Sequence, residues 1–170
     1  NENVKIIKFG HPEIEINKEQ KNIKIQKLDQ NDRVVFFGGK LSNWNIEMKD
    51  NTNLSKHKIV GNDKNNLTGC LNSYDMELLN IGLSFKDSNC EDAVNFVRVT
   101  GSVSKMDIQN SSFDAMDADF SKINFNNVMI NKSLNDCLDF SYGEYKVLNS
   151  QMSFFGDNAI SVGEASYVNI

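Results

Sequence analysis

Proline, tryptophan, histidine and cysteine are scarce in this sequence: its 170 residues include one Pro, one Trp, two His and three Cys. The cysteines, Cys70, Cys90 and Cys137, are too few and too irregularly spaced for a disulfide framework. They also lack the paired spacing of a zinc site. The cysteine content therefore argues against a disulfide-rich scaffold and a zinc module, and it leaves the redox compartment open.

Long apolar runs and an excess of positive charge are missing too. No segment approaches the ~18 consecutive apolar residues of a membrane helix, and residues 1–20 lack the apolar core of a signal peptide. Lys and Arg number 18 against 23 Asp and Glu, which gives a net charge of −5. Because nucleic-acid binding needs clustered cations, we expect neither a nucleic-acid partner nor membrane insertion. The lysines from Lys18 to Lys27 alternate with Ile, and we interpret them as a solvated strand face.

The chain does contain an internal repeat of about 22 residues. One five-residue pattern, polar at its first position and apolar at its third and fifth, recurs in steps of 22. Its first residues are Asp92, Asp114, Asp136 and Asn158. A second pattern, apolar-x-apolar, recurs in steps of 23, 37, 23 and 22 and starts at Ile23, Ile46, Leu83, Met106 and Val128. A fixed period in this range is typical of solenoid proteins, in which each repeat forms one coil.

Short strands separated by Asn, Asp, Ser and Gly favour β-structure over helix. We therefore predict an all-β protein, a right-handed parallel β-helix of about six coils in which neighbouring coils stack ~4.8 Å apart. Stacking aligns equivalent residues into columns, and two such columns are predicted to be buried. The first contains Val94, Met116, Leu138 and Ile160, and the second contains Phe96, Ala118, Phe140 and Val162.

We predict a single domain over residues 1–170. Residues 1–22 are expected to form an N-terminal cap strand, since Ile14 and Ile16 alternate there with Glu. The step of 37 exceeds one coil, and we place the extra residues in a loop insertion over 51–68.

Residues 69–170 form the regular coils of this prediction. The chain begins with Asn1 instead of Met and ends inside an apparent strand at Ile170. We therefore expect a processed product or a fragment of a longer protein, with coils that continue past the C-terminal end. The open ends of such a solenoid would allow end-to-end association.

Residues 114–163 resemble the pectinase-like family of right-handed β-helix proteins, and polygalacturonase-type glycoside hydrolases in particular. The resemblance rests on Asp114, on Asn135-Asp136-Cys137-Leu138 and on Ala159-Ile160-Ser161-Val162-Gly163. In that family, successive coils present Asn-Thr-Asp, Asp-Asp-Cys and Gly-His-Gly motifs on one face, followed by an Arg-x-Lys motif. The resemblance implies a polysaccharide substrate, with Asp114 and Asp136 as active-site carboxylates.

The sequence departs from the family motifs in three ways. Asn135 stands in place of the first Asp, Asn158 stands in place of the His, and Arg-x-Lys does not follow. We therefore favour a protein without catalytic activity; if it is an enzyme, the resemblance implies a polygalacturonase-like glycoside hydrolase, a polysaccharide lyase or an epimerase. Residues 157–164 also resemble β-helix repeats of bacterial surface and spore-coat-type proteins, which implies an extracellular or cell-surface location.

Outward positions of the repeated strand carry the most distinct polar feature, which we call the acidic stripe. The stripe consists of Asp117, Asp119 and Asp139, with Ser141 and Tyr142 beside it as further candidate ligand-binding residues. Asp117 and Asp119 share one side of a strand, and Asp139 follows Asp117 by 22 residues. Carboxylates ~5 Å apart repel one another by ~0.8 kcal/mol in water, and more where they are buried. A shared proton, a nearby cation such as Arg98, or a Ca²⁺ ion bound by the stripe would relieve this repulsion.

Structural roles compete with these functional ones. Asp and Asn side chains also cap exposed backbone amides at turns. For Asp92, Asp114, Asp136 and Asn158 we favour this capping role, whereas for the acidic stripe both interpretations stay open. Cys137 occupies a position that holds Ala in the other coils, so we interpret it as a packing residue.

The sequence thus favours a secreted or surface β-solenoid that binds polysaccharide or another glycan along the acidic stripe without catalysis. One alternative is a truncated enzyme that degrades or modifies polysaccharide, and another is a structural spacer or fibre segment. No cofactor is expected, with Ca²⁺ at Asp117, Asp119 and Asp139 as the one alternative.

Overall fold

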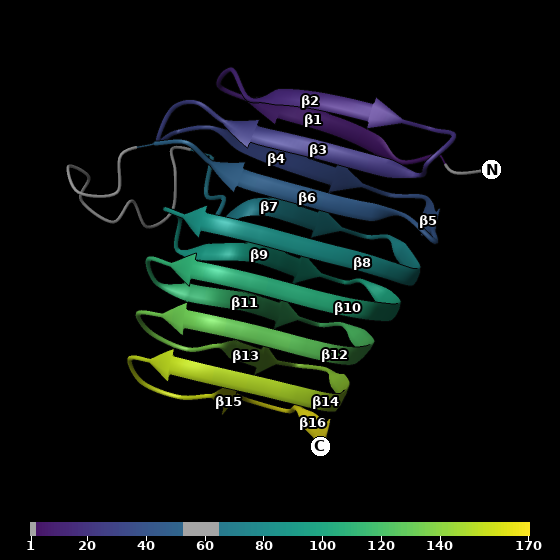
Figure 1. The fold of residues 1–170 in the computed structure, drawn as a ribbon. Coiled ribbons are helices and arrows are strands. Elements are labelled where there is room, and N and C mark those ends of the chain that lie inside the picture. Colours follow the sequence, from purple (N-terminus) through teal and green to yellow (C-terminus); the bar gives the residue numbers. More distant parts are fainter. Residues whose placement is uncertain (1–2, 53–64) are drawn as a thin grey trace.

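The computed structural model describes residues 3–52 and 65–170. The described residues form strands and turns without any helix, so no helix in this part of the chain is long and apolar enough to cross a membrane. Two sheets lie one behind the other and run from the N-terminal to the C-terminal end (Figure 1). The predicted fold class is confirmed: the protein is a β-solenoid of about six turns.

Along the parallel coils, successive strands alternate between the two sheets, because each coil contributes to both sheets. Sheet A contains, in spatial order, β1 (Lys5–Phe9), β4 (Arg33–Phe37), β7 (Gly69–Tyr74), β9 (Asp92–Val97), β11 (Asp114–Asp119), β13 (Leu138–Ser141) and β15 (Ile160–Val162). Sheet B contains β2 (Glu13–Asn17), β3 (Asn22–Lys27), β6 (Asn45–Asp50), β8 (Glu77–Ser88), β10 (Thr100–Ser111), β12 (Lys122–Ser133), β14 (Glu144–Phe155) and β16 (Tyr167–Asn169), while β5 (Lys40–Ser42) pairs with β8.

The core of the solenoid follows the predicted columns. In sheet A, Met116 pairs in parallel register with Val94 on one side and with Leu138 on the other, and all three side chains are buried. Ile160 continues this column in the last strand, where it is partly buried. In the second column Phe96, Ala118 and Phe140 are buried, but Val162 is 52% exposed because it lies on the last strand of its sheet. The apolar pairs of sheet B align in the same way, from Ile23 and Ile25 to Val128 and Ile130.

Both sheets begin with an antiparallel strand, whereas the strands of the coils that follow are parallel. β1 runs antiparallel to β4, and β2 runs antiparallel to β3. Within residues 1–22, where the sequence predicts a cap strand, β2 lies at the edge of sheet B and β1 lies at the edge of sheet A. These two strands cover the edges of β4 and β3, the first parallel strands of the two sheets.

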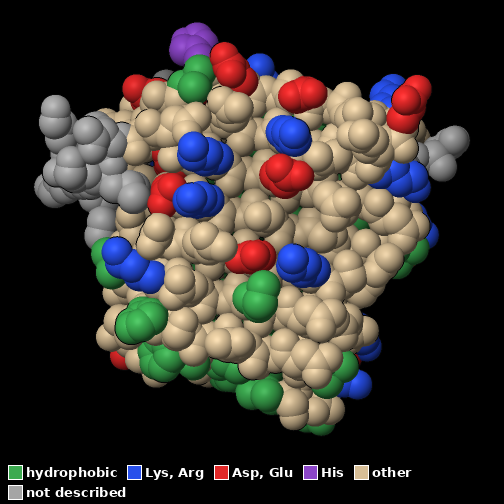
Figure 2. Space-filling view, in the orientation of Figure 1, with side chains coloured by type: hydrophobic (Ala, Val, Ile, Leu, Met, Phe, Trp, Pro, Cys, Tyr) green, Lys and Arg blue, Asp and Glu red, His purple; other side chains and the backbone are tan. Residues whose placement is uncertain are grey.

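The C-terminal end differs from the capped N-terminal end. Hydrophobic side chains gather toward this end of the molecule (Figure 2). The exposed apolar residues there include Phe154, Phe155, Val162, Tyr167 and Ile170. Such an end can associate with another strand or apolar surface, and the end-to-end association expected from the sequence stays a prediction.

The loop insertion predicted over 51–68 is described only at its two ends. Asn51, Thr52 and residues 65–68 lie outside the strands. The rest of the insertion lies outside the described residues.

Candidate functional site

The acidic stripe lies on the outer face of sheet A, as its spacing predicts. Asp117 pairs with Asp139 across neighbouring strands, and Asp119 pairs with Ser141. Met116 and Ala118, which alternate with the two aspartates along β11, are fully buried. Because side chains alternate across a strand, the half-buried aspartates must point away from the core. The structure therefore brings the stripe and Ser141 together on one surface.

A hydrogen-bonded amide joins the stripe to a buried carboxyl group one coil earlier. Nδ2 of Asn95 donates to Oδ2 of Asp117 at 3.2 Å and to Oδ2 of Asp92 at 3.3 Å. The same nitrogen lies 2.7 Å from Oγ1 of Thr68. Asn95 and Asp92 are 4% and 2% exposed, so this link is closed to solvent. Three coils thus contribute polar groups to one continuous cluster.

The carboxyl groups of this cluster hold protons more tightly than free aspartates do. Burial, followed by the charge of Asp92, raises the pKa of Asp117 to about 9. Burial also raises the pKa of Asp92 to about 7, although hydrogen bonds from Thr68 and Asn95 oppose that shift. At Asp119, burial and the charge of Asp139 raise the pKa. Carboxyl groups in this state can donate a hydrogen bond as well as accept one.

No Lys or Arg among the described residues forms an ion pair with the acidic stripe. Arg98 was one candidate cation from the sequence. Its guanidinium instead binds Asp75, with Nε 2.6 Å from Oδ1 and Nη2 3.0 Å from Oδ2. Arg98 therefore does not neutralise the stripe by direct contact.

A pair of exposed aromatic rings borders the stripe where the chain turns from sheet A to sheet B. Phe120 and Tyr142 stack with ring centroids 4.8 Å apart and an interplanar angle of 8°. Both residues have φ of 51°, in the left-handed region that bulky side chains rarely adopt. They directly follow Asp119 and Ser141 in the chain, and they are 56% and 44% exposed. Asn would fit this backbone conformation better, so the conformation does not explain the choice of aromatic residues.

Asp114 and Asp136, the two residues matched to family active-site carboxylates, act as backbone caps. Oδ1 of Asp114 accepts hydrogen bonds from the backbone N–H of Asp136 and from Nδ2 of Asn135, each at 2.8 Å. Oδ1 of Asp136 accepts the backbone N–H of Asn158 at 2.7 Å. Both aspartates are buried, at 7% and 6% exposure, so in this structure a polymer cannot reach them directly. The capping role favoured from the sequence is confirmed for these two residues, and burial raises the pKa of Asp114 to about 6.

The Ca²⁺ hypothesis for the stripe gains no support from the geometry. Among residues 3–52 and 65–170, no three or more His, Cys, Asp or Glu side chains converge as a set that could hold a metal ion. Asp117, Asp119 and Asp139 share a face without forming such a set.

The expectation of a solvated face from Lys18 to Lys27 is wrong at its last residue. Along β3 the side chains of Ile23, Ile25 and Lys27 face the interior, whereas Lys24 and Gln26 face solvent. Lys27 is fully buried. The alternation of side chains along a strand predicts this burial, since Lys27 follows Ile25 by two residues and therefore faces the same side as Ile23 and Ile25.

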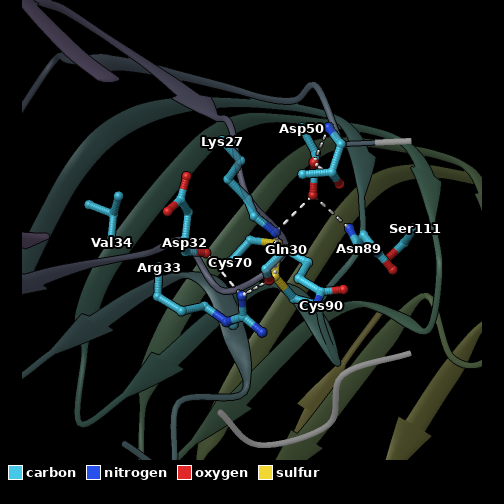
Figure 3. Close-up of a disulfide and its surroundings, with 12 residues drawn as sticks. Lys27, Gln30, Asp32, Arg33, Val34, Asp50, Cys70, Asn89, Cys90 and Ser111 are labelled. Carbon is cyan, nitrogen blue, oxygen red and sulfur yellow. Dashed lines mark hydrogen bonds and ion pairs between the residues drawn. A yellow bond between two sulfur atoms is a disulfide. The ribbon is translucent and has the colours of Figure 1, made fainter. Parts of the chain in front are cut away.

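The buried Lys27 ammonium lies between a carboxylate and a disulfide (Figure 3). Its Nζ is 2.8 Å from Oδ2 of Asp50 and 3.5 and 3.3 Å from the Sγ atoms of Cys70 and Cys90. Asp50 also accepts the backbone N–H groups of Thr52 and Asn89. Burial lowers the pKa of Lys27, and the charge of Asp50 opposes that shift. This cluster is compact and fully enclosed.

Cysteine pairing is a further feature that the sequence reasoning missed. Cys70 and Cys90 form a disulfide between residues 20 positions apart. That spacing is close to one coil, which was the available signal. Cys137 is buried and free, and burial raises the pKa of its thiol to about 11, in line with a packing role.

Comparison with known proteins yields no relative. The sequence matches no protein-family model, and neither a curated protein nor a solved structure matches it.

Proposed function

We propose that this protein is a non-catalytic β-solenoid that binds polysaccharide on the outer face of sheet A, at the acidic stripe and the Phe120–Tyr142 pair. The stacked pair carries the proposal. Sugar rings pack their apolar C–H faces on aromatic rings, and their hydroxyl groups bind carboxyl and hydroxyl side chains. Asp119 and Ser141 directly precede the two rings, so both kinds of contact are available at adjacent positions.

The solenoid provides a regular surface for a polymer. Asp117, Asp119, Asp139 and Ser141 come from neighbouring coils, which repeat at ~4.8 Å. A chain of sugar units that crosses the coils would meet equivalent side chains at each step. The disulfide supports a secreted or cell-surface location, because disulfides persist in oxidising compartments.

Replacing the aromatic pair tests this function. The variants Phe120→Asn and Tyr142→Asn keep a residue type that tolerates the left-handed conformation, so the fold should be preserved. We expect each variant to lose at least tenfold in affinity for the glycan that the unaltered protein selects from a glycan array. Phe154→Asn is a matched control, since Phe154 is also exposed and has φ of 57° but lies in β14 of sheet B. Equal affinity in all four proteins would contradict the proposal.

One observation favours a polysaccharide-cleaving enzyme as the second candidate. Asp117, with its raised pKa, faces Asp139 on the next strand, and a general acid beside a second carboxylate is the arrangement of a retaining glycosidase. The glycan identified on the array would be incubated with the protein and assayed for new reducing ends. Release of reducing ends that Asp117→Asn abolishes would establish the enzyme; binding without release would establish the non-catalytic module.

A further inference from the structure

The N-terminal end of the solenoid contains a cavity of about 380 Å³. β1 pairs with β4 in sheet A, and β2 pairs with β3 in sheet B. The two cap strands thus belong to different sheets at the same end of the molecule (Figure 1). The cavity lies between these sheets, because Val4 and Phe36 from the sheet A side and Ile16 from sheet B line it. Its volume falls within the range of small-molecule sites.

The floor of the cavity is the apolar core itself. Ile23, Phe36, Leu41 and Trp44 line it, and each is at most 6% exposed. Ile16, at the mouth, is 47% exposed. An apolar ligand would remove such surface from water, which is worth about 25 cal/mol per Å². The lining therefore suits a hydrocarbon chain.

Among the described residues, the charged groups that line the cavity are all cationic. Lys18 and Lys21 contribute to the lining and no described Asp or Glu does, although the chain as a whole has a net charge of −5. Nζ of Lys21 donates to the backbone oxygen of Ser42 at 3.0 Å, which fixes its position. Neither lysine forms an ion pair with another described residue. Such a rim attracts a negative charge.

We propose that this cavity binds an amphiphilic carboxylate, with its acyl chain on the floor formed by Ile23, Phe36, Leu41 and Trp44 and its carboxylate at Lys18 and Lys21. An apolar floor with two cations at its edge complements both parts of a fatty acid. A neutral alcohol of equal length would match only the floor, and a quaternary ammonium amphiphile would be repelled by the lysines. The head group therefore distinguishes this site from unspecific hydrophobic binding.

Trp44 provides a direct readout, because it is the only tryptophan and it lines the cavity. Decanoate, decanol and decyltrimethylammonium would be titrated below their micelle concentrations while Trp44 fluorescence is recorded. We expect saturable binding in which decanoate binds at least tenfold more tightly than decyltrimethylammonium. Octanoate should bind more weakly than decanoate, by about fourfold per methylene removed.

The double variant Lys18→Gln/Lys21→Gln should lower the decanoate affinity to that of decanol and leave decanol binding unchanged. Lys24→Gln is the matched control, since Lys24 is exposed on β3 but does not line the cavity. The proposal is overturned by equal affinity for decanoate and decyltrimethylammonium, or by absence of a fluorescence change with any amphiphile. It is also overturned if the protein self-associates with Trp44 shielded before any ligand is added, because a second copy then occupies the cavity. If the double variant does not fold, the titrations of the three amphiphiles with the unaltered protein still test the proposal.

Discussion

Carboxylates are withdrawn from water in two regions of this molecule, and the two regions treat them differently. Between the sheets, Asp50 is paired with the Lys27 ammonium at 2.8 Å and receives backbone N–H donors. On the outer face of sheet A, the aspartates of the acidic stripe have no ion-pair partner among the described residues. In the first region, the ammonium and the backbone donors compensate the buried carboxylate. In the second, the free-energy cost of burying the carboxyl groups is not compensated by a cation, and a bound ligand could lower it.

Removing the Lys27 ammonium should lower the stability of the fold more than any other change considered below. Lys27→Met leaves Asp50 buried without its counter-charge, so we expect the free energy of unfolding to fall by about 3 to 5 kcal/mol. Urea denaturation measures this change. The double variant Lys27→Met/Asp50→Asn removes both charges and keeps an acceptor for the backbone N–H groups of Thr52 and Asn89, so it should recover most of the lost stability. A loss below about 1 kcal/mol in the single variant would mean that the ion pair is not buried as described.

The Cys70–Cys90 disulfide beside this ion pair should contribute somewhat less to the free energy of unfolding. Replacing Cys70 and Cys90 with Ala opens a loop between residues 20 apart, and we expect a loss of about 3 kcal/mol. Cys137→Ala is the control, because Ala93, Ala115 and Ala159 occupy the equivalent position in three other coils. Reducing agent should destabilise the unaltered protein and have no effect on the Cys70→Ala/Cys90→Ala variant. If reducing agent leaves the denaturation midpoint of the unaltered protein unchanged, the disulfide is absent in solution.

The raised pKa values of three aspartates in sheet A predict that the free energy of unfolding decreases as pH rises. The folded-state pKa values of Asp114, Asp92 and Asp117 are about 6, 7 and 9, whereas an unfolded Asp has a pKa of ~3.9. Between these values the folded state binds more protons than the unfolded state, so the free energy of unfolding falls with rising pH. From about pH 5 to 8, Asp117 alone would lower the free energy of unfolding by about 4 kcal/mol, and solvent screening of its half-buried carboxyl reduces that figure.

The difference between the unaltered protein and Asp117→Asn isolates this contribution. The pKa values of Asp32 and Asp75 are lowered, so their own contributions change only near and below ~pH 4, outside the window. Thermal unfolding from pH 5 to 8 should show a steeper loss of stability in the unaltered protein than in the variant. Parallel pH profiles would show that Asp117 ionises as freely in the folded state as in the unfolded state.

The regular half of the molecule was predictable because one residue period sets its register. A 22-residue step places Met116 beside Val94 and Leu138, and the same step places Asp117 beside Asp139. Burial and facing then follow from the alternation of side chains along a strand. The fold, its core columns and the common face of the acidic stripe therefore came from the sequence alone.

The irregular half depends on contacts that no period specifies. The antiparallel pairing of β1 and the 20-residue spacing of Cys70 and Cys90 depart from the period. Lys27 and Asp50 do follow the 23-residue step of β3 and β6, but their burial depends on the ion pair that they form. The stacking of Phe120 on Tyr142 does follow the period, but the left-handed turn that exposes both rings is a local backbone feature. Sequence reasoning placed Tyr142 at the surface and missed its partner.

The most direct test of the acidic stripe as a binding site is the thermal midpoint and glycan affinity of one variant, Asp117→Asn/Asp139→Asn. Asn keeps the shape of each side chain and cannot ionise, so the variant removes both carboxyl groups from the face that they share. If the stripe serves a ligand, this variant should lose glycan binding while its melting temperature stays the same or rises, because burial disfavours ionisation of Asp117 and Asn has no charge to bury. A lower melting temperature with unchanged glycan binding would contradict the account, since it would show that the two aspartates stabilise the fold and do not contact the ligand.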